Sequence, residues 1–263
     1  MASFLIQFAV LTATFVAVGS LERIRRLQHT PSRLRRPWFE TDLLWYLVAA
    51  LAAGVSTFVL RPLLVRLSVP GLSDLVADVP APVALFVAVI IFDGVFFAIH
   101  MMLHRSDALW NVHKVHHSSR HLDVLATTRT HAFEHLVRNV PSQLVLFALG
   151  FSANTIATAV LLLAAFGALN HSNLRIPLRR VEWLLITPRL HRVHHVPSST
   201  LNNYATIFTV WDRIAGTLRR TDLPAGTVLG VPTELDTYPQ SFLPAFLEPA
   251  RQTRAQRRLQ PVP

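Results

Sequence analysis

The pattern H-x-x-H-H occurs twice in this chain, at residues 113–117 and 191–195, and it limits what the chain can form. On a helix, positions i, i+3 and i+4 share one face, so each copy would direct three imidazoles the same way. Neutral imidazole is the commonest metal ligand in proteins. A third pair, His100 and His104, precedes the first copy at helical spacing. The repetition favours a metal site over a solvated, histidine-rich surface.

The composition indicates a membrane protein. Of the 263 residues, 51% are hydrophobic and 15% are charged, and the mean hydropathy is +0.38, which is more apolar than an ordinary soluble domain. The formal charge of +10 comes almost entirely from arginines in short runs beside apolar stretches. We interpret these runs as membrane-flanking charge and expect no nucleic-acid partner. Because the chain has no cysteine, any metal must be held by nitrogen and oxygen.

Four apolar stretches predict about four transmembrane spans. The first, residues 2–20, is interpreted as a transmembrane helix because its positive charges follow the apolar run, whereas a signal peptide carries them before it. The second and third run over about 43–60 and 82–103. The fourth, 140–169, is interrupted by proline, glycine and asparagine, and is long enough for one kinked span or a tight helical hairpin.

The third span ends in ionisable residues. Asp93, His100 and His104 are spaced by seven and four residues, which places all three on one helical stripe. Ionisable groups inside a membrane helix are costly, so they usually face the interior of a bundle and mark a site. The sequence therefore predicts a functional site at the end of this span.

The remaining segments are polar or punctuated by proline. We expect a loop with a short interfacial helix over 62–80, a short apolar helix on the membrane surface over 238–248, and a disordered tail after Arg251. The expected fold is an all-α integral membrane helical bundle with a cytoplasmic, helical, His-rich cap. Its expected parts are an N-terminal transmembrane hairpin and connecting loop (1–80), a catalytic domain (81–220), and a C-terminal interfacial segment with the tail (221–263).

Charge predicts the orientation. Six arginines lie between Arg23 and Arg36, against Arg61 and Arg66 after the second span. The positive-inside rule then places the first loop in the cytoplasm and the N-terminus outside. All the histidine motifs fall on that same cytoplasmic side. We therefore expect a multi-pass protein of the cell inner membrane with its metal site facing the cytoplasm.

The clustered histidines outnumber the ligands of one metal ion. They number nine, whereas tetrahedral zinc takes four protein ligands at most. Nine imidazoles suit two ions, and imidazole binds iron, zinc and copper alike. A two-metal centre at the mouth of a membrane bundle can meet a lipid chain. A bare hydrocarbon cannot be hydrolysed, but oxygen activated by iron can attack it.

The order of the motifs resembles the fatty acid hydroxylase/sterol desaturase superfamily. Asp93 with H-x-x-x-H is followed by LWNVHKVHHSS, RTHAFE, NHSN, TPRLHRVHH, NNY and WDRIAGT, all within about residues 90–220. The resemblance implies an integral membrane, all-helical, non-haem di-iron oxygenase that uses O2 and external electrons to hydroxylate or desaturate a lipid C–H position. The chain departs from the family at Met101, Ala205 and Ala215, where Arg, Gly and Phe are usual. These changes affect a salt bridge and packing around the lipid pocket.

The resemblance also implies a ligand set. The implied metal ligands are His100, His104, His113, His116, His117, His171, His191, His194, His195 and His131. Metal-bound histidines need partners that orient their ring nitrogens, and Asp93, Glu134 and Asn170 are candidates, with ordinary buried hydrogen bonding as the alternative. Asp212 is expected to be structural, pairing an arginine or capping a helix.

The implied cofactors are two iron ions, with O2 as co-substrate. We see no haem-binding cytochrome segment, so we expect a separate electron-transfer protein of ferredoxin or cytochrome type, besides the lipid substrate and membrane lipids. The choice of lipid, and of hydroxylation or desaturation, stays open. One alternative is a zinc metallopeptidase, because His131, Glu134 and His135 fit H-x-x-E-H. Another is a membrane metal transporter or sensor. The peptidase would leave the other clustered histidines unexplained.

Overall fold

The structure, a computed structural model, describes residues 2–32, 36–56, 59, 62, 66, 70–198 and 202–259. Over these residues it consists of helices, turns and loops without a strand, which confirms the predicted all-helical fold. The α-helices are α1 (Ala2–Leu21), α2 (Phe39–Val55), α4 (Pro70–Ala77), α5 (Ala81–Arg105), α6 (Asp107–His117), α7 (Ala132–Ala148), α8 (Ala153–Asn170), α9 (Pro188–His194), α10 (Val210–Ile214) and α11 (Phe242–Leu259). Short 3-10 helices are η1 (Arg25–Leu27), η4 (Val124–Thr128) and η5 (Arg179–Val181).

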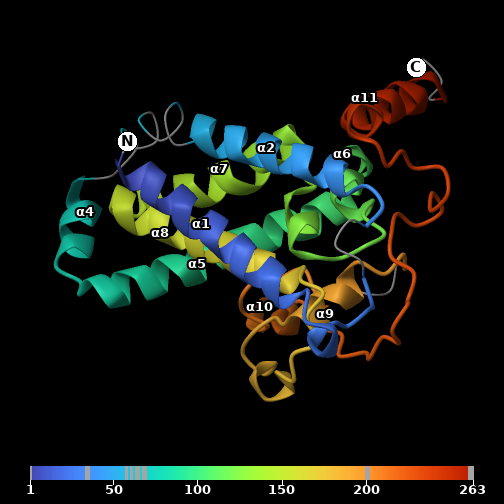
Figure 1. Cartoon of the computed structure of the whole chain (residues 1–263). Helices are drawn as coiled ribbons and strands as arrows, with labels where there is room; N and C mark the ends of the chain where they lie inside the picture. The colour runs from blue at the N-terminus through green and yellow to red at the C-terminus, as the bar shows by residue number, and fades with distance from the viewer. Residues whose placement is uncertain are drawn as a thin grey trace.

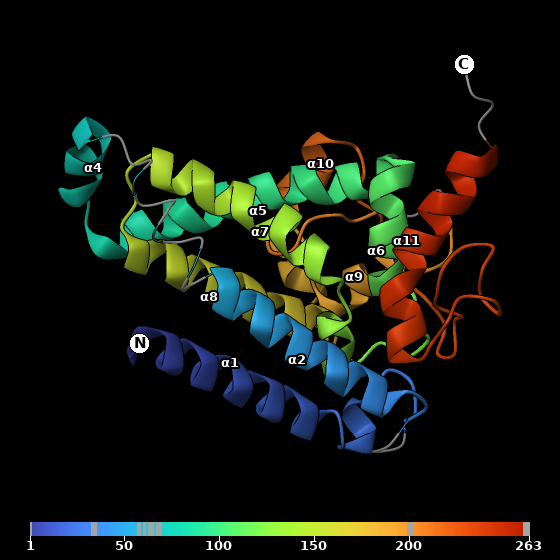
Figure 2. The ribbon, with the colours of Figure 1, turned by 90° about the horizontal axis from the view of Figure 1, so that it is seen from above.

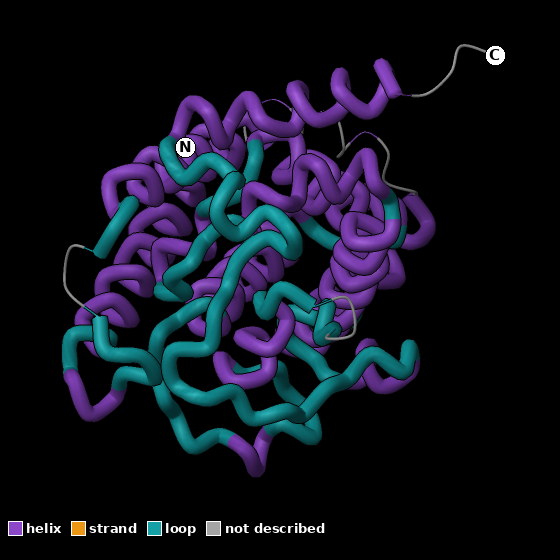
Figure 3. Tube along the Cα trace, turned by 90° about the vertical axis from the view of Figure 1, so that its right-hand side faces the viewer, coloured by secondary structure: helices purple, strands orange, loops and turns teal. Residues whose placement is uncertain are grey.

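Helices α1, α2, α5, α7 and α8 run between two ends of the molecule (Figure 1; Figure 2). One end carries the N-terminus, α4 and the turn between α7 and α8. The other end carries α6, α9 and α11, and the loops that cover it are seen face-on in Figure 3. Helices α6 and α9 and the C-terminal ends of α5 and α8 therefore lie at the same end of the bundle.

Two described helices, α5 and α8, are long and apolar enough to cross a membrane. In α1 the apolar part that the structure describes, Leu5–Leu21, is shorter than in α5 and α8. Helix α2 ends at Val55. The expected end of the second span, Leu60, lies outside the described residues. Four spans therefore stay a prediction. The short helix expected between 62 and 80 is α4.

The fourth apolar stretch forms a helical hairpin. Helices α7 and α8 are separated at Gly150, which has a φ of +85° and a backbone so close to α4 that a Cβ would lie 2.5 Å from the nitrogen of Ser73. Only glycine tolerates both conditions. Pro141 lies inside α7 and does not end it, and Ser152 caps α8 by accepting from the amide of Thr155. Of the two predicted forms, the hairpin is the one observed.

The core lies between α5, α7 and α8. Phe92 and Phe96 of α5 pack with Leu146 of α7 and Ile156 of α8, and all four are buried. Ile207, from the segment before α10, joins the same cluster. This packing holds the end of α5, where His100 lies, in a fixed relation to α8.

The C-terminal segment, expected to be a disordered tail after Arg251, forms the helix α11 as far as Leu259. Its residue Phe242 contacts the fully buried Trp45 of α2 at a centroid distance of 4.9 Å, and Ala245 is buried beside it. Further along, Gln252 accepts a hydrogen bond from Lys114 of α6 and donates one to Glu234. The structure thus has helix in place of the expected disorder as far as Leu259, with these contacts reaching Gln252; residues 260–263 lie outside the described part. The interfacial position of 238–248 stays a prediction.

Candidate metal centre

The two H-x-x-H-H copies lie on α6 and at the end of α9. Helix α9 begins at Pro188, which suits a first helical position, and Thr187 caps it by accepting from the amide of Leu190. The helix carries His191 and His194, and His195 follows as its C-terminal cap. Helix α5 brings His100 and His104 to the same end, and α8 ends just before His171.

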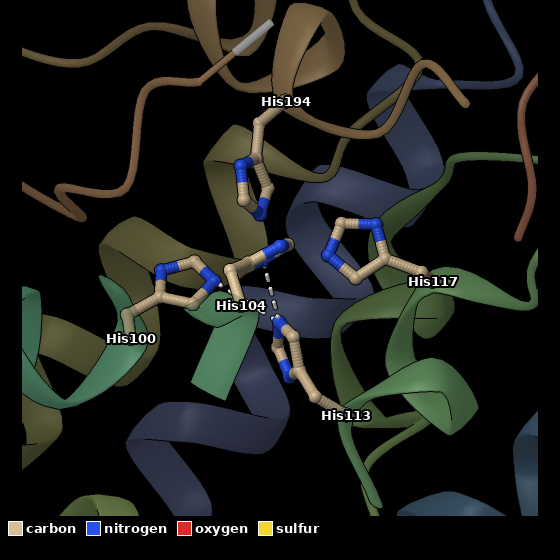
Figure 4. Close-up of side chains that lie close together, drawn as sticks. All are labelled: His100, His104, His113, His117 and His194. Atoms are coloured by element: carbon tan, nitrogen blue, oxygen red, sulfur yellow. Dashed lines mark hydrogen bonds between the residues drawn. The ribbon is translucent and has the colours of Figure 1, made fainter. Parts of the chain in front are cut away.

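Nine histidines form two neighbouring groups, and in each group nitrogens from all members lie within 4.8 Å of one another. The five-histidine group is His100, His104, His113, His117 and His194, and the four-histidine group is His116, His171, His191 and His195. Figure 4 shows the rings of the five-histidine group directed toward a common centre. Each H-x-x-H-H copy supplies both groups, although its three histidines share one helix face.

Hydrogen bonds fix the proton on the outer nitrogen of several rings. Nδ1 of His100 faces the carbonyl of Tyr204 at 2.6 Å, and Nδ1 of His171 faces the carbonyl of Gly167 at 2.7 Å. Nδ1 of His113 lies 2.8 Å from the carboxylate of Glu134. Because these acceptors carry no proton to give, Nδ1 must donate, and each Nε2 presents a lone pair toward the group.

The inward nitrogens are crowded in a way that suits a cation. His113 Nε2 lies 3.1 Å from Nε2 of both His100 and His104. His171 Nε2 lies 3.0 Å from that of His191 and 3.2 Å from that of His195. Lone pairs at such distances repel unless a positive charge lies among them.

Several of the rings are held neutral as well as crowded. Burial, with the neighbouring imidazoles, holds the pKa of His117 and His195 well below the usual value. His117 Nε2 and both nitrogens of His194 are buried and have no hydrogen-bond partner within the protein. Buried polar atoms without partners are costly, and metal coordination would satisfy one nitrogen of each ring. The donors present therefore fit metal ions in both groups.

Glu134 is the one expected orienting residue that contacts a ring. It is fully buried and accepts from His113 Nδ1 and, at 2.9 Å, from Arg138. Asp93 accepts instead from the amides of residues 206–208 and from the indole of Trp211, and Asn170 donates to the carbonyl of Thr206. Both hold the segment that follows Tyr204, which is the ordinary buried hydrogen bonding given above as the alternative.

His131 lies outside both groups. It caps α7, because its Nδ1 accepts from the amide of Phe133. Its ring stacks on Phe246 at a centroid distance of 4.7 Å. His135 also lies outside them, and its Nε2 is buried without a hydrogen-bond partner. The H-x-x-E-H residues therefore do not assemble a common site.

Asp212 has a structural role, with partners other than those expected. Its carboxylate accepts from the amides of Tyr204 and Ala205 at 2.8 and 3.0 Å, and from the hydroxyl of Thr217 at 2.6 Å. It thus binds a loop backbone, and neither pairs an arginine nor caps a helix. Together with Asp93, it holds the segment whose Tyr204 carbonyl orients His100.

Sequence reasoning missed a buried ion network behind the four-histidine group. Arg129 donates to Asp42 of α2 at 2.5 Å, and Asp42 also accepts from Arg36. The carbonyl of Arg129 faces His116 Nδ1 at 3.3 Å. An aspartate inside the apolar α2 was the available signal. Arg138 was also missed; it lies four residues after Glu134 and its guanidinium covers the ring of Phe96 at 4.2 Å.

A mostly apolar cavity of about 270 Å³ reaches the two groups from between the long helices. His100, His116, His171 and His191 line one part of it. Its other walls come from α1, α2, α7 and α8 and include Leu11, Phe15, Ala49, Ala53, Val140, Val160 and Leu163. An apolar chain lying in this cavity would have access to both groups of imidazoles.

Comparison with known proteins agrees with this site. The family model described as fatty acid hydroxylase matches residues 85–217. The chain is 31% identical over 140 residues to the ornithine lipid hydroxylase OlsE of Rhizobium tropici, a match that covers 52% of this chain and 42% of that protein. It is 30% identical over 124 residues to an alkylglycerol monooxygenase of Xenopus tropicalis, covering 46% and 27% of the two chains. An alkylglycerol monooxygenase of Danio rerio is 33% identical over 131 residues, with the same coverage.

The match spans less than half the length of these relatives. No solved structure matches the chain. The family model nevertheless covers half of the sequence and includes all nine grouped histidines. The two apolar helices α5 and α8 and this match together indicate a membrane protein. The resemblance inferred from the motifs is confirmed, and the chain belongs to the fatty acid hydroxylase family.

Proposed function

We propose that the chain is a membrane-bound, non-haem di-iron oxygenase that hydroxylates or desaturates a lipid C–H position. The observation that carries the proposal is the position of two adjacent groups of buried imidazoles on one apolar cavity. Bound iron would supply the activation of O2. The chain itself would hold the ions, exclude water with the apolar walls, and position the lipid chain beside them.

The ligand geometry favours iron over tetrahedral zinc. Five imidazoles in one group exceed the four ligands of a tetrahedral ion. Two nitrogens about 2.1 Å from one tetrahedral ion lie about 3.4 Å apart. The Nε2 atoms of His116, His191 and His195 lie 3.0–3.2 Å from that of His171, which suits an ion with more ligands. Neither group includes a carboxylate, so the protein ligands leave the full charge of both ions to be balanced by other species.

The proposed topology places the histidines in the cytoplasm. The described arginines between the end of α1 and the start of α2, which are Arg23, Arg25, Arg26 and Arg36, lie at the same end of the bundle as the histidines, and the N-terminal part of α1 lies at the other end. The positive-inside rule then gives an outside N-terminus. Helices α1, α2, α5 and the α7–α8 hairpin would cross the bilayer, and the loops around α6 and α9 would form the cytoplasmic cap. In a bacterial cell this membrane would be the inner one.

The substrate would be a lipid, in keeping with the names of the relatives, which specify an ornithine lipid and an alkylglycerol. The cavity between the long helices would take its apolar chain. Electrons would come from a separate ferredoxin or cytochrome on the cytoplasmic side. The competing functions have less support. The residues of the peptidase motif do not gather, and among the described residues both histidine groups lie at the same end, without the through-path that a transporter requires.

The proposal is tested by metal content and lipid analysis together. Purified protein should hold two irons per chain. His116→Ala and His194→Ala should each lose iron, whereas His121→Ala, outside both groups, should keep it. Cells that express the wild-type chain should contain a lipid heavier by one oxygen or lighter by two hydrogens, and cells with either ligand variant should not. Full iron in both ligand variants, or an unchanged lipid profile with the wild type, would contradict the proposal.

A further inference from the structure

Large apolar side chains are exposed beside α5 on the cap. Trp183 and Leu184, which follow η5, and Val210 and Ile214, on α10, form what we call the apolar corner; Trp183 is 63% and Ile214 76% exposed. The two parts are joined, because the carbonyl of Leu184 accepts from the amide of Thr209. Four large apolar groups gathered on a solvent-facing surface are unusual in a soluble domain.

The apolar corner lies against the part of α5 that would be within the membrane. Trp211 covers Gly94 so closely that a Cβ there would lie 2.9 Å from its ring, and Phe208 contacts the exposed Phe86 at a centroid distance of 6.5 Å. Figures 1 and 2 both show α10 beside α5. The surface of the apolar corner is therefore continuous with the exposed apolar face of α5.

The contacts along α5 show how deep in the bilayer the segment after Tyr204 would lie. About 20 helical residues cross the hydrocarbon core of a bilayer, so a span that begins at Ala81 leaves the core near His100. The segment after Tyr204 follows α5 from His100, which faces the carbonyl of Tyr204, to Asp93, which binds the amides of 206–208. Seven helical residues rise about 10 Å. The segment thus descends about 10 Å below the level where α5 leaves the hydrocarbon, a depth typical of interfacial insertion.

Basic side chains border the apolar corner. Arg213 donates to the carbonyl of Trp183 and Arg220 to that of Glu182, and both arginines are exposed. Arg180 is exposed in η5. An apolar surface bordered by arginine is the pattern of a segment that lies in the interface of a bilayer with anionic lipids.

We propose that the apolar corner is inserted into the cytoplasmic leaflet of the bilayer, as a second membrane contact of the cap besides the spans. This rests on the membrane placement in the proposed function. The inserted corner would bring lipid against the segment that holds His100. It would also explain why Asp93, halfway along α5, is fully buried and meets four N–H groups: the inserted segment satisfies a carboxylate at membrane depth.

The absence of cysteine from the chain allows a direct test. Ile214→Cys carries a nitroxide label in iron-loaded protein reconstituted into vesicles of phosphatidylethanolamine and phosphatidylglycerol. The measurement is the collision of the label with O2, which concentrates in lipid, against a water-soluble nickel chelate. Phe86→Cys, on the exposed face of α5, is the lipid reference, and Ala225→Cys, on an exposed turn of the cap, is the aqueous reference. Trp183→Cys provides a second position on the apolar corner.

We expect labels at Ile214 and Trp183 to match the Phe86 reference and to exceed the Ala225 reference several-fold in the ratio of O2 to nickel collisions. A match to Ala225 while Phe86 reports lipid would overturn this inference alone. Protection of such a water-exposed label by an added ferredoxin or cytochrome would show a protein-docking surface, which also overturns it. A water-exposed Phe86 label would reject the membrane placement of α5, and the proposed function with it.

Discussion

Glu134→Gln should weaken one metal position and spare the other. The Glu134 carboxylate is fully buried and lies 2.8 Å from His113 Nδ1, in the five-histidine group. Such a charge-assisted hydrogen bond contributes about 1.5–3 kcal/mol, and loss of a partner of this kind lowers metal affinity about 10–100-fold. Glutamine keeps one acceptor but loses the charge, so we expect the lower part of that range. In the four-histidine group, His116 and His171 face backbone carbonyls, which the substitution leaves in place.

The assay is iron content during titration with a chelator. At a chelator concentration at which the wild type keeps two irons, Glu134→Gln should keep one. Arg138→Met is the matched control, because it removes the other partner of Glu134 and leaves the bond to His113. This control should keep both irons. Simultaneous loss of both irons in Glu134→Gln, or loss of neither, would refute the assignment of Glu134 to one group.

Three further outcomes are expected. Asp93→Asn replaces an oxygen that accepts two of the four N–H groups bound by Asp93. At about 1.5–3 kcal/mol for each charge-assisted bond, it should destabilise the fold by about 3–6 kcal/mol, measured by thermal unfolding in detergent. Burial raises the pKa of Glu22 to about 7. The stability that its proton contributes is therefore complete below the pKa of the unfolded state, near 4.3, and is lost as the pH rises through about 7. Glu22→Gln should flatten the resulting fall in unfolding temperature between pH 5 and 8. His135→Ala should keep most iron and activity, whereas His117→Ala should lose both; the opposite result would favour the peptidase.

The helices were predictable where apolar composition alone determines them. The α7–α8 break follows from Gly150, since its positive φ and the approach of α4 exclude a side chain. Pro141 was a misleading signal, because one proline within a long apolar helix does not end it when the helix is held on both sides by packing. The continuation of α11 was missed because the basic charge and the prolines at the end of the chain were taken as signs of disorder, although Arg, Gln, Ala and Leu are good helix formers; contacts with Trp45 and Lys114 add to this propensity.

Spacing indicated the two H-x-x-H-H copies and the pair His100 and His104, whereas His171 and His131 came from the family resemblance, and neither source gave the partition into two groups. Spacing places His113, His116 and His117 on one face of α6, and it gives no information on which neighbour each ring will meet. That depends on how α5, α8 and α9 pack against α6. The actual partners of Asp93 lie more than 100 residues away along the chain, in the segment before α10, so no local pattern could have identified them.

The contribution of α9 to both groups has a consequence for biosynthesis. Its three histidines follow every long helix of the bundle in the sequence. A nascent chain that ends before residue 190 would contain four members of the five-histidine group and two members of the four-histidine group. Both positions are therefore completed at the same step, after the last helix of the bundle has been made. Until then the nascent chain contains neither group of imidazoles in complete form.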